Sequence, residues 1–117
     1  MIEKKIISLA NNLSNYGIKS NSKNIVTKKN RICGDKIKMN VEVKNNLIVR
    51  VNYETNSCIF CQASASLLAK YMKKKKLSEL NYILSLPNYR FLLSKKYQSR
   101  RECVMLPIEA LIKATKN

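Results

Sequence analysis

Two runs of alternating residues on either side of Asn45-Asn46 constrain the fold of this chain more than any other feature. The apolar side chains occupy every second position of both runs, at Ile37, Met39, Val41 and Val43 and again at Leu47, Val49, Val51 and Tyr53. A period of two places such residues on one face of a β-strand, and two asparagines can adopt the positive φ of a tight turn. Residues 36–53 are therefore predicted to form a β-hairpin with one buried face.

Residues 2–16 precede this hairpin and carry apolar side chains three or four positions apart. This spacing predicts an N-terminal helix, and Gly17 is a natural stop for it. Residues 18–32 are polar, basic and without a period. We expect them to form a loop or a mobile segment.

Helical spacing returns after the hairpin. Residues 59–76 predict a second helix, and residues 77–86 predict a short third helix that ends before Pro87. A final helix is expected from about Cys103, with Pro107 in its first turn or so, where a missing N–H costs little. This order of elements predicts an α+β fold in which helices pack on one face of a small antiparallel sheet.

The composition excludes most familiar enzyme classes. The chain has no histidine, which rules out Ser-His and Cys-His nucleophile pairs, imidazole bases and two-histidine zinc fingers. Its two glycines, Gly17 and Gly34, are too far apart for a Walker A loop or a dinucleotide-binding turn. The N-terminus is too polar for a secretory signal, and no stretch approaches the roughly 20 apolar residues of a membrane span. We therefore expect a cytoplasmic protein with no membrane partner.

The chain is strongly basic, with 23 lysines and arginines against 7 acidic residues and a formal net charge of +16. Such a charge attracts anionic partners such as nucleic acid. A general drift towards lysine, which AT-rich codons favour, gives the same charge without any ligand. No aromatic side chain is interleaved with the basic runs, as a base-stacking surface requires. We therefore predict no specific nucleic-acid partner.

Four cysteines carry the chemistry that remains, and in a reducing cytosol they are more typical of metal ligands or reactive thiols than of disulfides. The pair Cys58-x-x-Cys61 has the spacing of a metal knuckle, although redox motifs and chance also produce it. Cys33, Cys58 and Cys103 fall at the ends of predicted elements, where thiols stay accessible. A helix dipole and the arginines at positions 100 and 101 are expected to lower the pKa of Cys103.

Asp35 follows Cys33 by two residues. In an extended segment such residues project to the same side, so a thiolate and a carboxylate could bind one ion, with Fe²⁺ or Zn²⁺ the metals that suit this donor pair. A turn residue at the start of a strand is an equally good interpretation of Asp35. With a single domain expected over residues 1–117, residues 1–30 supply the N-terminal helix and the mobile basic segment, and residues 31–117 the metal-binding core.

Three motifs occur in a fixed order around the hairpin. They are Cys33-Gly34-Asp35, the run Cys58-Ile59-Phe60-Cys61-Gln62-Ala63-Ser64-Ala65-Ser66, and Cys103-Val104-Met105-Leu106 before the final helix. Together they resemble the U-type (Isc/Suf/Nif-like) iron–sulfur cluster assembly scaffold family over about residues 30–115. The first motif alone is weak, but the three in this order are highly specific.

The resemblance implies a role for each matching residue. Cys33, Cys58 and Cys103 correspond to the family cysteines that hold a nascent cluster or metal and receive sulfur. Asp35 corresponds to a metal ligand that keeps the cluster labile, and Cys103 to the acceptor of persulfide sulfur from a cysteine desulfurase. The N-terminal helix over residues 2–16 falls where family members meet that desulfurase.

Two departures from the family pattern bear on the chemistry. Glu102 stands where many Isc-branch scaffolds have a histidine, which favours the Suf/Nif-like branch, whose members can work as zinc-bound sulfur acceptors. Cys61 is extra relative to the commonest pattern, and the sequence leaves it open whether it is a fourth sulfur ligand, a resolving thiol or a passenger.

Three functions follow from these observations. The first is a non-catalytic scaffold that assembles an iron–sulfur cluster, expected to be [2Fe-2S], on Cys33, Asp35, Cys58 and Cys103, with a cysteine desulfurase and apo-acceptor or carrier proteins as partners. The second is a zinc-dependent sulfurtransferase that uses the same site. The third is a basic nucleic-acid-binding module with a structural zinc, whose affinity would fall steeply with salt. A homodimer is left open.

Overall fold

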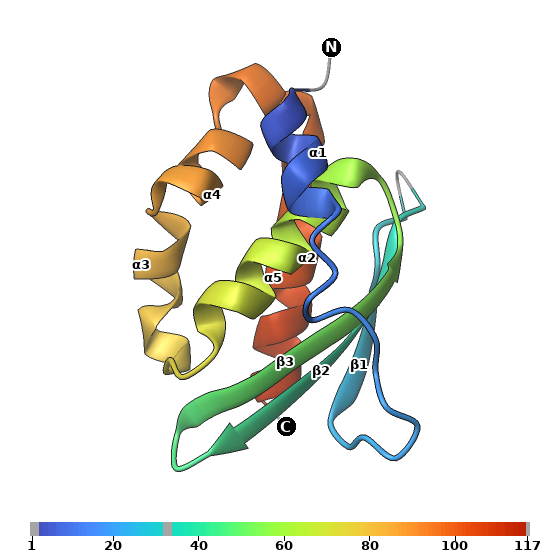
Figure 1. The fold of residues 1–117 in the computed structure, drawn as a ribbon, viewed down its shortest axis with the longest axis vertical. Helices are drawn as coiled ribbons and strands as arrows, with labels where there is room; N and C mark the ends of the chain where they lie inside the picture. The colour runs from blue at the N-terminus through green and yellow to red at the C-terminus, as the bar shows by residue number, and fades with distance from the viewer. Residues whose placement is uncertain (1–2, 32–33, 117) are drawn as a thin grey trace.

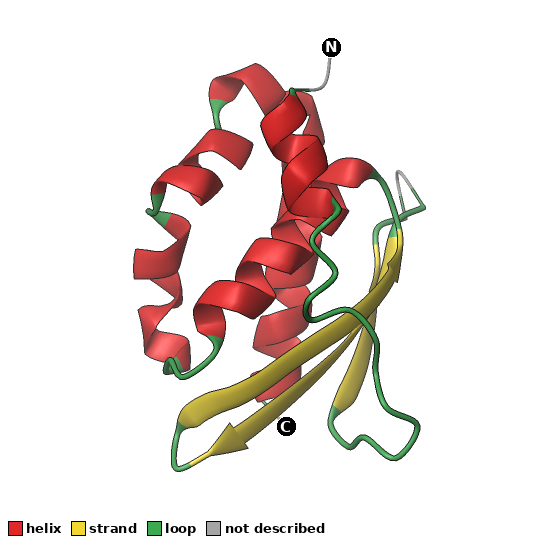
Figure 2. Ribbon diagram, in the orientation of Figure 1, coloured by secondary structure: helices red, strands yellow, loops and turns green. Residues whose placement is uncertain are grey.

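The computed structural model describes residues 3–31 and 34–116. Its strands form one three-stranded antiparallel sheet in the order β1-β2-β3, and the helices gather on one face of that sheet (Figures 1 and 2). The strands are β1 (Ile25–Lys29), β2 (Lys36–Lys44) and β3 (Leu47–Asn56). The predicted α+β architecture is confirmed.

The hairpin of β2 and β3 forms where the alternating pattern predicts it. Asn45 and Asn46 make the connection with φ of 52° and 65°, the positive values that a two-residue hairpin turn requires. Asparagine adopts this conformation at low cost because its short polar side chain tolerates the left-handed region.

A β-bulge changes which residues of the hairpin are buried. Glu42 lies opposite Arg50 and Val43 lies opposite Ile48, so Val49 is the additional residue on β3. The bulge turns Ile48 into the core, where it is buried, and leaves Leu47 exposed. The prediction that Leu47 shares the buried face with Val51 is therefore wrong, because a register shift reverses the faces on one side of it.

Strand β1 lies in the segment that the sequence predicts to be a loop, and for Ile25–Lys29 that prediction is wrong. Val26 lies opposite Met39 of β2, and both side chains are buried. The side-chain amide of Asn40 donates a hydrogen bond to the carbonyl of Lys23 and fixes the approach to the strand. The five residues of this edge strand, IVTKK, do not alternate between apolar and polar, so they carry no period of two.

The N-terminal helix α1 (Lys4–Ala10) is shorter than the helix predicted over residues 2–16, of which residue 2 lies outside the described residues. Its Ile6 and Ala10 are buried, and the helix packs on α2. The carboxylate of Glu3 pairs with Lys96 and accepts a hydrogen bond from the Tyr97 hydroxyl at 2.8 Å. These contacts fasten the start of α1 to a segment more than ninety residues away.

The helices after the hairpin occur in the predicted order. They are α2 (Ile59–Met72), the short 3-10 helix η1 (Leu77–Glu79), α3 (Leu80–Leu84), α4 (Pro87–Leu92), η2 (Lys95–Arg100) and α5 (Arg101–Thr115). Helix α5 begins earlier than predicted, so Pro107 lies in its interior and not in its first turn. None of the helices in the described part of the chain is long and apolar enough to cross a membrane.

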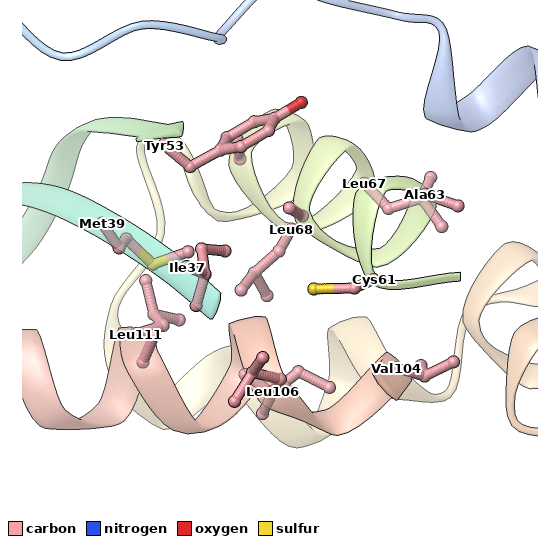
Figure 3. Packing of buried hydrophobic residues seen from close by; sticks show 14 of the residues in the cluster. Ile37, Met39, Tyr53, Cys61, Ala63, Leu67, Leu68, Val104, Leu106 and Leu111 are labelled. Carbon is pink, nitrogen blue, oxygen red and sulfur yellow. The ribbon is translucent and has the colours of Figure 1, made fainter. Parts of the chain in front are cut away.

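The core lies between the sheet and the two long helices, with α2 against β3 and α5 against β1 and β2 (Figure 3). The small residues Ala63–Ser66 of α2 are all buried and allow α5 to approach closely. The Ser64 hydroxyl donates to the Val104 carbonyl of α5 at 2.7 Å, and the buried Tyr89 hydroxyl donates to the Ser64 carbonyl at 2.7 Å. The predicted packing role of this small-residue run is consistent with these contacts.

Neighbouring substitutions on β1 test the face assignment of that strand. Val26→Ala removes buried methyl groups and is expected to lower the free energy of unfolding by about 2 kcal/mol. Ile25→Ala, on the exposed side, should cost less than about 1 kcal/mol. Urea denaturation of both variants measures the difference. Equal losses would show that β1 does not bury its Val26 side.

Candidate metal centre

One carboxylate and two thiols converge at the end of the sheet nearest the start of α2. Asp35 comes directly before β2, Cys58 is the N-cap of α2, and Cys103 is the third residue of α5. A carboxylate oxygen of Asp35 and the two Sγ atoms all lie within 4.8 Å of one another. Ligand atoms at such separations can bind a single ion with modest adjustment.

The carboxylate of Asp35 is held by one oxygen and left available by the other. Its Oδ1 accepts the Cys58 N–H at 3.1 Å, which supplies an acceptor at the start of α2. Its Oδ2 is buried and has no hydrogen-bond partner among residues 3–31 and 34–116. A buried carboxylate oxygen without a partner carries a desolvation penalty. A metal ion bound to Oδ2 would relieve that penalty, so the donor set fits an iron or zinc ligand site.

The turn before Asp35 is closed by its own backbone. Asn30 N–H donates to the Asp35 carbonyl at 2.8 Å, and Gly34 N–H donates to the Asn30 carbonyl at 2.8 Å. Gly34 has φ of 78°, which explains why a glycine stands beside the aspartate. Cys33, the remaining predicted ligand, lies outside the described residues. Asn30 is a contributor that the sequence did not single out, since nothing in its local pattern distinguishes it from other loop asparagines.

Cys103 differs from its predicted environment. Only 4 % of its surface is exposed, and burial, together with the neighbouring Cys58 and Asp35, raises the pKa of its thiol. The expectation of an accessible thiol with a lowered pKa is therefore wrong for this structure. Arg100, predicted to lower that pKa, has its guanidinium 5.8 Å from the centre of the Phe60 ring. A bound metal would favour the Cys103 thiolate again.

Cys61 is not part of the ligand group that Asp35, Cys58 and Cys103 form. Its side chain is fully buried in the core between α2 and α5, as Figure 3 shows, and its Sγ lies 4.0 Å from the Thr55 hydroxyl. Burial raises the pKa of the Cys61 thiol to about 12. The interpretation of Cys61 as a fourth ligand receives no support from this arrangement.

Glu102 neighbours Cys103 in sequence, but its side chain is exposed and is not a member of the ligand group formed by Asp35, Cys58 and Cys103. Asn30 Nδ2 donates to Glu102 Oε2 at 3.5 Å. Both residues line a cleft of ≈ 560 Å³ that Lys29, Arg31 and Arg101 also border. Basic and acidic side chains both border this cleft, and its residues Asn30 and Glu102 belong to the segments that carry Asp35 and Cys103.

The structure defines a class of protein: a small α+β domain in which two helix starts and the beginning of the central strand bring together two thiols and a carboxylate, a candidate metal site. The sequence profile of the NifU-like N terminal domain matches residues 1–117. The chain therefore belongs to the NifU-like N-terminal domain family, and the predicted resemblance is confirmed. No curated protein matches the sequence.

Two solved structures share this fold over nearly the whole chain. One is assigned as an iron–sulfur cluster assembly scaffold protein for the SUF system of Fervidobacterium islandicum, with a TM-score of 0.81, 23% identity and coverage of 95% of this chain and 93% of that one. The other is the N-terminal part of a NifU-like protein from Brucella abortus, with a TM-score of 0.81, 18% identity and coverage of 97% and 91%. At these identities the two establish the fold.

The buried thiol of Cys61 predicts a loss of stability at alkaline pH. Its pKa is raised in the folded chain, so the unfolded chain releases the proton first, and the free energy of unfolding falls as pH rises above about 8.5. Between about pH 8 and about pH 10 this contribution should amount to roughly 1–2 kcal/mol.

Cys61→Ala isolates that contribution from the other groups that titrate in the same range. Denaturant unfolding of the metal-free wild type and of this variant, repeated across the pH range, should give a shallower fall for the variant. Parallel curves for the two proteins would contradict the assignment of the alkaline loss to Cys61.

Proposed function

We propose that this protein is an iron–sulfur cluster assembly scaffold that builds a transient cluster on Cys33, Asp35, Cys58 and Cys103. The cluster is cargo, which the protein passes to apo-acceptor or carrier proteins, and the protein itself is a non-catalytic carrier. The observation that carries this proposal is the convergence of Asp35, Cys58 and Cys103 from three separate segments, with one buried carboxylate oxygen open to a ligand.

The donor set supports temporary binding. Thiolates are the usual ligands of iron–sulfur clusters, and one carboxylate in place of a fourth thiolate gives a weaker and more exchangeable site. Cys58 is only half-buried, so an acceptor can approach one side of the cluster. Cys33 is proposed as the remaining ligand, because it stands two residues before Asp35 in the sequence.

Sulfur is proposed to arrive as a persulfide from a cysteine desulfurase, with Cys103 as the first acceptor. The Sγ atoms of Cys103 and Cys58 lie within 4.8 Å of each other, so a sulfane sulfur can pass between them by thiol exchange. Helix α1 is the proposed docking element for the desulfurase, since it is anchored through Glu3 and leaves Ile7 41% exposed.

Zinc-dependent sulfur transfer is the second candidate, favoured by Glu102 in the place of the Isc-branch histidine, since Glu102 is not in the ligand group. Anaerobic reconstitution with iron, sulfide and desulfurase distinguishes the two functions. Visible charge-transfer bands that survive desalting support the scaffold. Retention of zinc with no chromophore, together with persulfide on the protein, supports the sulfurtransferase.

Asp35 is expected to control the release of the cluster. Asp35→Ala removes the exchangeable ligand, and transfer of a reconstituted cluster to an apo-acceptor should slow roughly tenfold, a barrier change of about 1.4 kcal/mol. Asp35→Asn keeps an oxygen for the Cys58 N–H while removing the charge, and it should slow transfer as well. The measurement is the absorbance of the acceptor's cluster over time. Slowing by Asp35→Ala alone would assign Asp35 to the fold, and faster transfer in both variants would contradict its role as a labile ligand.

Cys103 is expected to be required for receipt of sulfur. Cys103→Ser should abolish persulfide transfer from the desulfurase, because an alcohol cannot attack the donor sulfur at neutral pH. Mass spectrometry of the protein after incubation with desulfurase and cysteine measures the added sulfur. Undiminished transfer would identify Cys58 or Cys61 as the first acceptor.

A further inference from the structure

Two of the thiols lie at the start of helix α2, three residues apart. Cys58 is the N-cap residue and Cys61 is the third residue of the helix, and both are reduced thiols in this structure. The ligand group includes only Cys58 of this pair. Cys61, which the commonest family pattern lacks, therefore has no role in the function proposed above.

The helix directs the Cys61 side chain towards Cys58. Side chains of an α-helix lean towards its N-terminus, over the residues three and four positions earlier. The surroundings of Cys61 agree with this direction, since its Sγ lies 4.0 Å from the hydroxyl of Thr55, which donates to the hydroxyl of Ser57, the residue before Cys58. Residues three apart at a helix surface have Cβ atoms about 5–6 Å from each other. A disulfide needs Cβ atoms about 3.5–4.5 Å apart, so the pair must approach by about 1–2 Å to form one.

The backbone of Cys58 can adjust to close that distance. Cys58 has an extended conformation, with φ of −69° and ψ of 165°, and its N–H bonds to Asp35 and not to the helix. Its carbonyl accepts the Gln62 N–H at 3.1 Å, which keeps the first turn of α2 in place. The pair thus has the N-terminal helix position at which Cys-x-x-Cys dithiols form disulfides.

Exposure gives the two thiols different tasks. Cys58 is half-buried and can meet a sulfur donor, whereas Cys61 has no exposed surface. A thiol that no external molecule reaches can still react with a sulfur held by its neighbour. The arrangement separates an attacking thiol at the surface from a resolving thiol beneath it.

We infer that Cys61 is the resolving thiol that converts sulfane sulfur on Cys58 into sulfide. The Cys61 sulfur attacks the Cys58 sulfur of a Cys58 persulfide, a bond forms between the two Sγ atoms, and the bond to the outer sulfur breaks. The outer sulfur leaves with the electron pair as HS⁻ and the Cys61 proton is released. The dithiol pair supplies the two electrons that reduce the sulfur, and a cellular dithiol reductant resets the disulfide. This role rests on the proposed function only for the source of the persulfide.

Cys103 is the competing partner of Cys58, because it lies within the same 4.8 Å group. Tryptic peptides separate the possibilities, since Cys58 and Cys61 fall together on residues 51–70, Cys103 falls on residues 102–113 and Cys33 on residues 32–36. A Cys58–Cys61 disulfide is therefore a loss of two hydrogens within one peptide. A Cys58–Cys103 disulfide is a cross-link between two peptides.

The experiment uses the full-length, metal-free chain, which is loaded with inorganic tetrasulfide, desalted and sampled over time. In the wild type, the mass of one sulfur atom on peptide 51–70 should disappear while that peptide loses two hydrogens and one sulfide per chain is released. In Cys61→Ser the added sulfur should persist at least roughly tenfold longer. In Cys103→Ser peptide 51–70 should still form its internal disulfide.

Two outcomes would overturn the assignment. One is sulfide release from Cys61→Ser at the wild-type rate. The other is loss of sulfide release in Cys103→Ser, together with a cross-link between peptides 51–70 and 102–113 in the wild type. Treatment of the same proteins with diamide tests disulfide formation without any persulfide. Because neither assay contains iron, zinc or desulfurase, failure here is distinguishable from failure of the scaffold function, which is read from cluster reconstitution.

Discussion

The contact between α2 and α5 is the constraint on which the metal centre depends. Cys58 and Cys103 are 45 positions apart, and they meet only because the small residues of α2 let the α5 backbone come close. The Ser64 hydroxyl fixes this approach through the Val104 carbonyl, one residue from Cys103, the proposed ligand on α5. Tyr89 adds α4 to the same buried network. The same helix contact therefore determines both the packing and the distance between the thiols. A larger side chain at Ser64 would move α2 and α5 apart, and Cys58 and Cys103 with them.

Asp35 connects the sheet to this helix pair. It comes directly before β2, and one of its oxygens holds the first N–H of α2 at Cys58. An anionic group at a helix N-terminus is favoured by the helix dipole and by the unpaired N–H groups there. The same carboxylate thus stabilises the start of α2 and offers its second oxygen to the centre. Its dual role explains why an aspartate serves here although a cysteine would bind soft metals more tightly.

Much of the fold could be predicted from local pattern, and the failures have a common physical cause. The hairpin followed from a period of two and a turn that only a few residue types adopt, as Asn45 and Asn46 show. Strand β1 could not be predicted, because Val26 gains its burial from Met39, a partner 13 residues away. The bulge at Val49 is likewise a property of the pairing between β2 and β3 and not of either strand alone. These features are set by tertiary contacts, which local periodicity does not contain.

For the candidate site, the sequence likewise predicted which residues take part but not how deeply each of them is buried. Motif order identified Asp35, Cys58 and Cys103, but it could not give their burial, because burial of Cys103 depends on where α5 begins and on what covers it. The burial changes the chemistry: a covered thiol binds its proton more tightly, so a metal or a sulfur donor must displace that proton to react. Burial also raises the pKa of the Cys61 thiol, which is fully buried and lies outside the ligand group. The half-buried Cys58 thiol thus lies beside two covered thiols, Cys61 and Cys103, each of which must lose a tightly held proton before its sulfur reacts.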